Sequence, residues 1–121
     1  MADSILREKT KDFAKTIVTE MAKIREERKE YVLTNQLLRS GTSVGANVHE
    51  AQYAQGMLDF ISKLEIALKE CFESEYWLEL LFETGYMSKQ NFDELNERCR
   101  TIRRMLISSC KTAKDKINST T

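Results

Sequence analysis

The chain has 121 residues, and its 19 lysines and arginines balance 19 aspartates and glutamates, so the formal net charge is zero. This length fits one domain with a modest core, and the balanced charge provides no overall attraction to nucleic acid or to a membrane surface. The apolar runs are far shorter than a membrane span and no basic-then-apolar signal segment opens the chain, so we expect a cytoplasmic protein.

The first predicted helix extends from about Asp3 or Ser4, either of which can cap it, to Arg28. Apolar residues with the helical period define its buried stripe: Leu6, Phe13, Ile17, Met21 and Ile24. The charged stretch from Arg25 to Glu30 ends this apolar pattern. The second predicted helix then extends from about Tyr31 to Ala54, before Gly56 interrupts the chain.

Small residues distinguish the second helix. Its apolar stripe contains Leu33, Leu37, Val44, Val48 and Ala51, with Ser40 and Gly41 within it. Gly41 and Gly45 lie four residues apart on one face, and each destabilises a helix interior by about 1 kcal/mol relative to alanine. We expect the close approach of another helix, from the same subunit or from a neighbouring one, to offset this cost. The alternative is a helix that bends or breaks at these positions.

The third predicted helix extends from Met57 to about Glu83, and Gly85 is expected to end it in the left-handed conformation. One face carries Phe60, Leu64, Ala67, Cys71, Leu78 and Leu81, and four more residues widen this face: Ile61, Leu68, Phe72 and Phe82. Ser88 is the predicted cap of the fourth helix. The seam of that helix repeats every three or four residues: Phe92, Leu95, Cys99, Ile102, Leu106, Ser109, Ala113 and Ile117. The pattern predicts one all-α domain, an antiparallel four-helix bundle over residues 1–117, followed by a disordered end over residues 118–121.

A polar ribbon borders the apolar stripe of the second helix. At 100° per residue its members fall within an arc of roughly 80°: Gln36, Arg39, Ser43, Asn47 and Glu50. We expect these side chains to hydrogen-bond across helices and to set their register. Arg39 is expected to pair with Glu50 or with a carboxylate of the third helix. Because the ribbon also contains an acid, a base and hydrogen-bond donors, catalysis is the alternative interpretation.

Residues 36–51 read Gln-x-x-Arg-Ser-Gly-x-Ser-Val-x-Ala-Asn-Val-x-Glu-Ala, and related motifs follow at Phe60–Glu70, Glu75–Leu81 and Thr84–Tyr86. Over about residues 10–115 the chain resembles the bacterial four helix bundle proteins. They are also called intervening-sequence proteins, because some are encoded within insertions of large-subunit ribosomal RNA genes. The resemblance implies subunits that assemble into homopentameric barrels. It also implies a role in the common fold or assembly for the motif positions Gln36, Arg39, Gly41, Ser43, Asn47 and Glu50, and we group Gly45 with them as an expected interface residue. A distant relative, the accessory protein of diversity-generating retroelements, binds nucleic acid and a reverse transcriptase, but most members have no assigned activity.

The sequence lacks the residue patterns of common helical-bundle enzymes. A di-iron carboxylate site requires two Glu-x-x-His motifs, and the single histidine, His49, excludes it. Cys71, Cys99 and Cys110 have no zinc-finger spacing, and we expect them to be buried free thiols. We therefore expect no catalytic residues, no metal, no cofactor and a non-enzymatic protein.

Charge is unevenly distributed along the chain: residues 50–97 carry a net charge of −8, and residues 98–116 carry +6. Five basic residues of the fourth helix lie within an arc of roughly 100° and form a candidate nucleic-acid contact, the basic stripe: Arg100, Arg103, Arg104, Lys111 and Lys114. Two other interpretations are favourable interaction with the helix dipole and pairing with acidic residues of the third helix or of another subunit. Because the antiparallel arrangement places the stripe near the start of the third helix, we expect part of it to stay unpaired. Any binding to RNA or DNA should involve the backbone and depend on salt.

Three hypotheses for function follow. The first is a non-enzymatic homo-oligomeric scaffold or binding protein, with RNA or DNA as the leading partner and no membrane contact. The second is an adaptor that binds another protein through the acidic face of the third helix and never binds nucleic acid. The third and least favoured is an enzyme that uses the polar ribbon.

Overall fold

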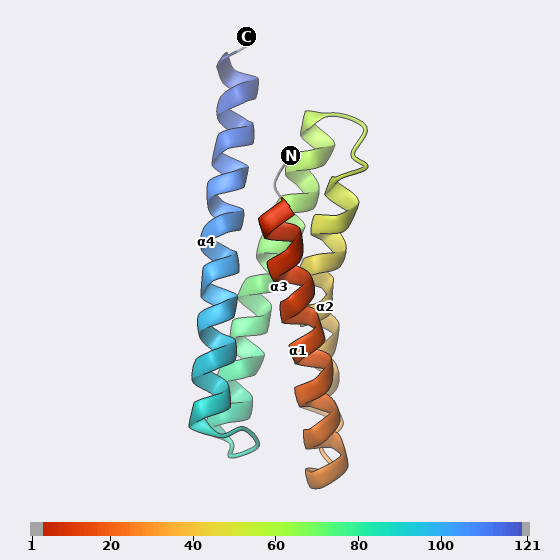
Figure 1. The fold of residues 1–121 in the computed structure, drawn as a ribbon, viewed down its shortest axis with the longest axis vertical. Coiled ribbons are helices and arrows are strands. Elements are labelled where there is room, and N and C mark those ends of the chain that lie inside the picture. Colours follow the sequence, from red (N-terminus) through yellow and green to blue (C-terminus); the bar gives the residue numbers. More distant parts are fainter. Residues whose placement is uncertain (1–3, 120–121) are drawn as a thin grey trace.

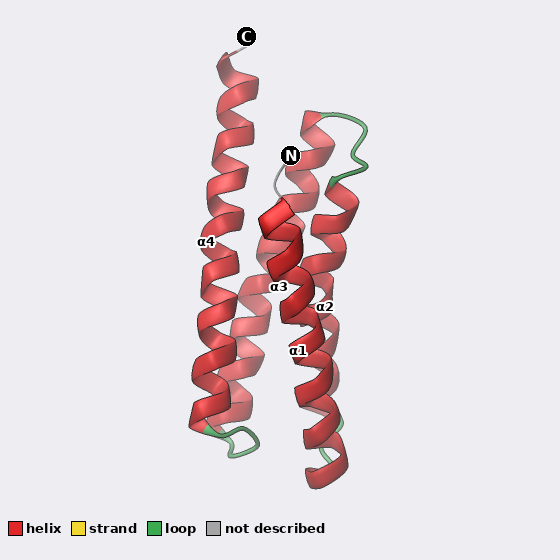
Figure 2. Ribbon diagram, viewed as in Figure 1, coloured by secondary structure: helices red, strands yellow, loops and turns green. Residues whose placement is uncertain are grey.

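The computed structural model describes residues 4–119, and this part of the chain contains four helices and no strands (Figure 2). Their bounds are α1 Ser4–Arg28, α2 Val32–Ala51, α3 Met57–Glu83 and α4 Lys89–Ser119. Successive helices are antiparallel, each packs against the next, and α4 packs back against α1 (Figure 1). The predicted all-α four-helix fold is therefore confirmed. None of these helices combines the length and the apolar character that crossing a membrane requires.

The core lies along the bundle axis and contains the stripes expected from the helical period. On α1, for example, Phe13, Ile17 and Met21 are at most 1% exposed. The prediction is wrong for one expected core residue, Phe72, which is 49% exposed. It follows the buried Cys71 by one position, so it lies at the outer edge of α3, where the guanidinium of Arg103 covers its ring.

The glycines of α2 mark a close approach to α1. A Cβ atom at Gly41 would lie 3.1 Å from Cγ1 of Ile17, and one at Gly45 would lie 3.2 Å from the carbonyl oxygen of Thr10. Helix α2 continues unbroken through both positions. The predicted compensation by close helix packing is confirmed, and it occurs within the subunit.

The α1–α2 connection uses residues that the sequence pattern did not single out. Lys29 takes the left-handed conformation, with φ of 56°, and its N–H donates to the carbonyl of Arg25. The Glu30 carboxylate then accepts hydrogen bonds from the N–H groups of the first turn of α2, which belong to Val32, Leu33 and Thr34. This side-chain cap places the start of α2 at Val32 instead of Tyr31.

Helix α2 ends at Ala51, three residues before the predicted end. The N–H groups of Gln52, Tyr53 and Ala54 each donate to the carbonyl three residues earlier. Such tightened turns replace the regular α-helical bonds at a helix end.

The α3–α4 connection agrees with expectation. Gly85 has φ of 87°, the Tyr86 N–H donates to the Leu81 carbonyl, and the Gly85 N–H donates to the Phe82 carbonyl. This pattern is a Schellman motif. The Ser88 hydroxyl oxygen accepts the N–H of Asn91 at 3.2 Å, so the predicted cap of α4 is confirmed.

Both chain ends were the subject of predictions. Helix α4 includes Asn118 and Ser119, two residues beyond the expected end, and the Ser119 hydroxyl donates to the Lys116 carbonyl in the last turn. The rest of the expected disordered end, residues 120–121, lies outside the described residues. The same is true of Asp3, one of the two predicted caps of α1, whereas Ser4 is helical.

Candidate functional site

The polar ribbon of α2 faces α3 and joins the two helices through charged groups. The Arg39 guanidinium pairs with Glu70 and Glu73 of α3, and Glu50 pairs with Lys63 of α3 at 3.0 Å. Arg39 thus takes the second of its two expected partners, a carboxylate of the third helix. The Glu73 carboxylate also accepts the indole N–H of Trp77 at 2.9 Å. These bonds fix the register of α2 against α3.

The remaining ribbon residues stay within α2. The Asn47 amide donates to the Ser43 carbonyl one turn earlier, at 2.9 Å. Among the described residues, the side chains of Gln36 and Ser43 make no hydrogen bond to another helix. A polar contact outside the ribbon connects the two helices instead, because the buried hydroxyl oxygens of Ser40 and Ser74 lie 2.9 Å apart. Sequence reasoning had placed Ser40 in the apolar stripe only as a small residue.

The ribbon is separate from the cavity at the end of the bundle. This cavity has a volume of about 590 Å³ and lies between the α2–α3 connection and the C-terminal part of α4, with Ala51, Met57, Phe60, Ser109, Ala113 and Lys116 among its lining residues. No ribbon side chain lines it, and none of its described lining residues is a histidine or a carboxylate. The described residues therefore bring no acid and base of the ribbon to a concave site.

The histidine and the cysteines lie in different environments. His49 is exposed, with its ring 5.5 Å from that of Tyr53. Cys71, Cys99 and Cys110 are buried free thiols, as predicted. The hydrogen bond with Cys71 and burial raise the pKa of the Cys99 thiol, and burial raises that of Cys110. Neutral thiols are poor nucleophiles.

The basic stripe of α4 is largely paired within the chain. The two closest pairs join it to α3, with Lys114 Nζ 2.7 Å from Glu65 and Arg103 Nε 2.6 Å from Glu75. Two further pairs lie along α4: Lys111 with Asp115 at 3.2 Å and Arg104 with Glu97 at 3.8 Å.

The pairing limits what the stripe offers to a nucleic acid. The Arg103 side chain is 26% exposed and is held by both Glu75 and the Phe72 ring. Arg100 is exposed and has no ion pair among the described residues, and Arg104 is 63% exposed with a long contact. Antiparallel packing places the basic end of α4 beside Glu65, near the start of α3, whereas Arg103 reaches Glu75 further along that helix.

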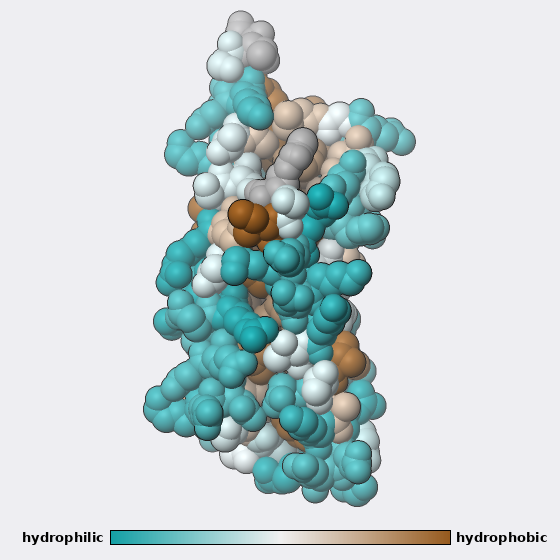
Figure 3. Space-filling model, viewed as in Figure 1, coloured by the Kyte–Doolittle hydropathy of each residue, from teal (hydrophilic) through white to brown (hydrophobic). Residues whose placement is uncertain are grey.

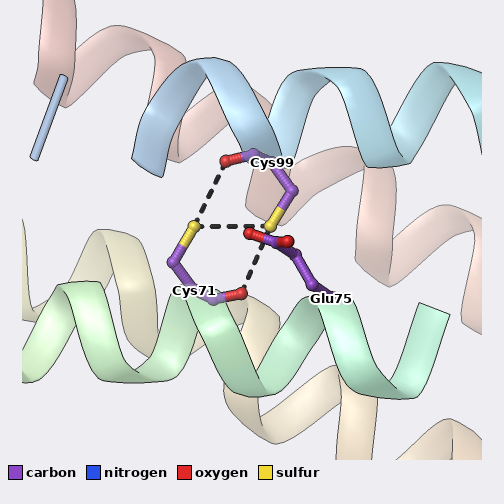
Figure 4. Close-up of side chains that lie close together, drawn as sticks. All are labelled: Cys71, Glu75 and Cys99. Carbon is purple, nitrogen blue, oxygen red and sulfur yellow. Dashed lines mark hydrogen bonds between the residues drawn. The ribbon is translucent and has the colours of Figure 1, made fainter. Parts of the chain in front are cut away.

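Two thiols and a carboxylate converge between α3 and α4, which sequence reasoning missed (Figure 4). The Sγ atoms of Cys71 and Cys99 are 3.3 Å apart, and each lies 3.3–3.4 Å from the carbonyl oxygen of the other cysteine. The Glu75 carboxylate lies beside them, one turn after Cys71. A signal was present in the sequence: the two cysteines are equidistant from Gly85, so an antiparallel hairpin turning there brings them opposite each other.

Comparison with known proteins identifies a family and a similar solved structure. The family model described as 23S rRNA-intervening sequence protein matches residues 2–108. A crystal structure of a protein with unknown function from the S23 ribosomal protein family of Bacteroides thetaiotaomicron is 46% identical, with a TM-score of 0.87. The match covers 88% of this chain and 99% of that one. No curated protein matches the chain.

Proposed function

The chain belongs to the 23S rRNA-intervening sequence protein family, and from this premise we propose that it is a non-enzymatic scaffold that assembles with copies of itself into a ring. The resemblance to barrel-forming members supplies the number of five subunits. The observation that carries the proposal is a pair of exposed apolar patches on two different faces of the bundle.

The first patch, the α3/α4 patch, consists of Phe72, Tyr76 and Ile107, which are 49%, 57% and 45% exposed. Arg103 covers part of the Phe72 ring, and the Tyr76 ring packs edge-on against Trp77. Rings held in this way lose little side-chain entropy on binding. Large aromatic groups of this kind are enriched in the contact areas of protein interfaces.

The second patch, the α1/α2 patch, consists of Val18, Tyr31 and Leu38, which line a shallow hollow between the two helices. Val18 and Tyr31 are 48% and 49% exposed. The Arg25 guanidinium lies 5.4 Å from the Tyr31 ring centroid. The face of the molecule drawn in Figure 3 is largely polar, with apolar side chains showing through in places.

The order of the helices places these patches on opposite sides of the bundle. Because α2 packs against α3 and α4 packs against α1, the α1/α2 face is opposite the α3/α4 face. Contact between two different patches is heterologous, and heterologous contacts close into a ring when the rotation per subunit allows it. In this arrangement the polar ribbon acts inside the subunit, since the bonds between α2 and α3 hold the two patches at a fixed angle.

The test measures molar mass by light scattering during size-exclusion chromatography. The wild-type protein should have the mass of about five subunits, and Val18→Glu and Ile107→Glu should each give monomers. Mixing these two variants should then give a heterodimer, because each retains the patch that the other has lost. Tyr53→Glu, at a residue 76% exposed outside both patches, is the control and should assemble normally. A monomeric wild type, or variants that never pair, would refute the ring.

Nucleic-acid contact is a second candidate function, favoured by the exposed Arg100 and Arg104 within the segment of net charge +6. The double variant Arg100→Glu/Arg104→Glu should weaken binding to a mixed-sequence RNA and reduce the salt slope by about 1 per lost contact. Arg103 is left intact because it holds Glu75. Lys11→Glu/Lys15→Glu on α1 makes the same change in charge and serves as the control. Unchanged binding would reject this surface, and protein partners recovered after nuclease treatment would favour the adaptor hypothesis.

A further inference from the structure

The interface between α3 and α4 encloses a cluster of three groups able to ligate a metal. Cys71 and Glu75 lie one helical turn apart on α3, and Cys99 faces them from α4 (Figure 4). The two sulfur atoms and a carboxylate oxygen all lie within 4.8 Å of one another. Both cysteines are 0% exposed, and the Glu75 side chain is 18% exposed at the edge of the cluster.

We propose that Cys71, Cys99 and Glu75 bind a thiophilic divalent cation of the zinc type, with Arg103 as the residue that positions Glu75. Zinc takes sulfur and carboxylate ligands in tetrahedral geometry, with bonds of 2.0–2.3 Å that place the ligand atoms about 3.5–3.8 Å apart. The observed separation of the two Sγ atoms, 3.3 Å, approaches this spacing. Three protein ligands leave the fourth position to water, as in zinc sites with an open coordination position.

The charges of the cluster balance when a dication is bound. Two thiolates and one carboxylate carry −3, so a dication leaves −1, and the Arg103 guanidinium brings the sum to zero. The Arg103 Nε lies 2.6 Å from Oε2 of Glu75, so the other carboxylate oxygen is available to a metal. A buried charge is tolerated when it is paired and hydrogen-bonded. Partners that orient a ligand in this way are typical of metal sites.

Proton release follows from this chemistry. Each cysteine loses its proton when its sulfur bonds to the ion, so two protons leave for each ion bound. Metal affinity should therefore increase with pH. A bound ion would link α3 to α4 inside the subunit.

Cobalt(II), a spectroscopic substitute for zinc, provides the test. Cobalt chloride added to the reduced protein should give a near-ultraviolet sulfur-to-cobalt band and the intense visible bands of tetrahedral cobalt. The bands should saturate at one ion per chain, and zinc should remove them. Cys71→Ala/Cys99→Ala should abolish the signal, whereas Cys110→Ala, the matched change at the third buried cysteine, should retain it.

Two further variants separate the roles of the other residues. Arg103→Gln should weaken cobalt binding by about 10–100-fold, as expected for the loss of a partner that orients a ligand. Glu75→Gln should weaken it more and should change the visible bands, because a ligand atom is lost. Circular dichroism of each variant would confirm the helical fold.

The proposal is wrong if folded, reduced wild-type protein gives no thiolate-to-cobalt band, or if the band persists in Cys71→Ala/Cys99→Ala. It is equally wrong if the two thiols do not bind cobalt and instead form a disulfide when the thiol oxidant diamide is added. All of these readouts are spectroscopic or chemical. A negative cobalt experiment therefore does not bear on the proposed assembly, and a monomeric mass does not bear on the proposed metal site.

Discussion

The two antiparallel hairpins of the bundle, α1/α2 and α3/α4, bring their helices together by different means. In α1/α2, the missing side chains of Gly41 and Gly45 let the backbone of α2 approach Ile17 and Thr10. In α3/α4, Cys71 and Cys99 meet through their sulfur atoms at 3.3 Å. The α1/α2 contact depends on the absence of side-chain atoms, whereas the α3/α4 contact is filled by small polarisable sulfur atoms.

The turns of the two hairpins also differ. Both hairpins require a residue in the left-handed conformation after the first helix, and that residue is Lys29 in one and Gly85 in the other. Left-handed backbone costs little for glycine and more for any residue with a Cβ atom. The α1/α2 hairpin is therefore optimised at its seam and strained at its turn, whereas the α3/α4 turn is unstrained.

The largest effect should come from adding atoms to the glycine seam. Gly41→Leu would force a side chain into the space occupied by Ile17, whose carbon atoms are already 3.1–3.2 Å from a Cβ position. We expect the free energy of unfolding to fall by about 3 kcal/mol, the upper part of the range for overpacked cores. Urea denaturation measures this loss. Gly56→Leu is the control, because nothing lies within 4 Å of a Cβ atom there, and a loss as large at Gly56 would contradict the packing argument.

A smaller loss should follow from removing atoms at the cysteine seam. Cys99→Ala deletes one buried sulfur atom, and we expect a loss of about 1 kcal/mol, similar to deleting one buried methylene group. Urea denaturation of the metal-free protein isolates this packing effect. Gly41→Leu should remain the more damaging change. The reverse order would mean that α2 can move away from α1 while the α3/α4 seam cannot relax.

Much of the fold was predictable because helical periodicity and capping are local properties. The stripes of α1 and α4, the Schellman turn at Gly85 and the Ser88 cap all follow from residue types at fixed spacings. The cap of α2 was missed because Glu30 is not a typical capping residue and lies within a run of charges. Phe72 was misplaced because periodicity alone does not determine where a buried face ends.

The candidate sites were less predictable, since they depend on which residues meet across helices. Periodicity placed the basic stripe on one side of α4 but did not show that Glu65 and Glu75 of α3 would pair with it. The cysteine cluster was missed because metal motifs are sought in local spacing, whereas Cys71 and Cys99 are 28 residues apart. Only the register of the α3/α4 hairpin brings them together.

The two turns should respond to substitution with opposite signs. Gly85→Ala should lower the free energy of unfolding by about 1 kcal/mol, because alanine is strained at φ of 87°. Lys29→Gly should raise it by about 0.5 kcal/mol, since relief of strain exceeds the extra entropy of an unfolded glycine. Thermal unfolding of both variants measures the difference, and two changes of the same sign would contradict the comparison of the turns.

The smallest effect is expected from the cap that follows Lys29. Burial of the Glu30 carboxyl raises its pKa, but N–H donors of Leu33, Thr34 and Val32 lower it by more, so the net value lies below the ordinary 4.5. A carboxyl whose pKa is lower in the folded state stabilises the protein above its unfolded pKa, and this contribution is lost as pH falls through the folded value. Glu30→Gln should therefore be less stable than wild type at pH 7, and the difference should narrow near pH 3 in urea denaturation. Glu27→Gln, which removes an exposed charge outside the cap, should not show this narrowing; if it does, the effect belongs to the net charge of the chain and not to the start of α2.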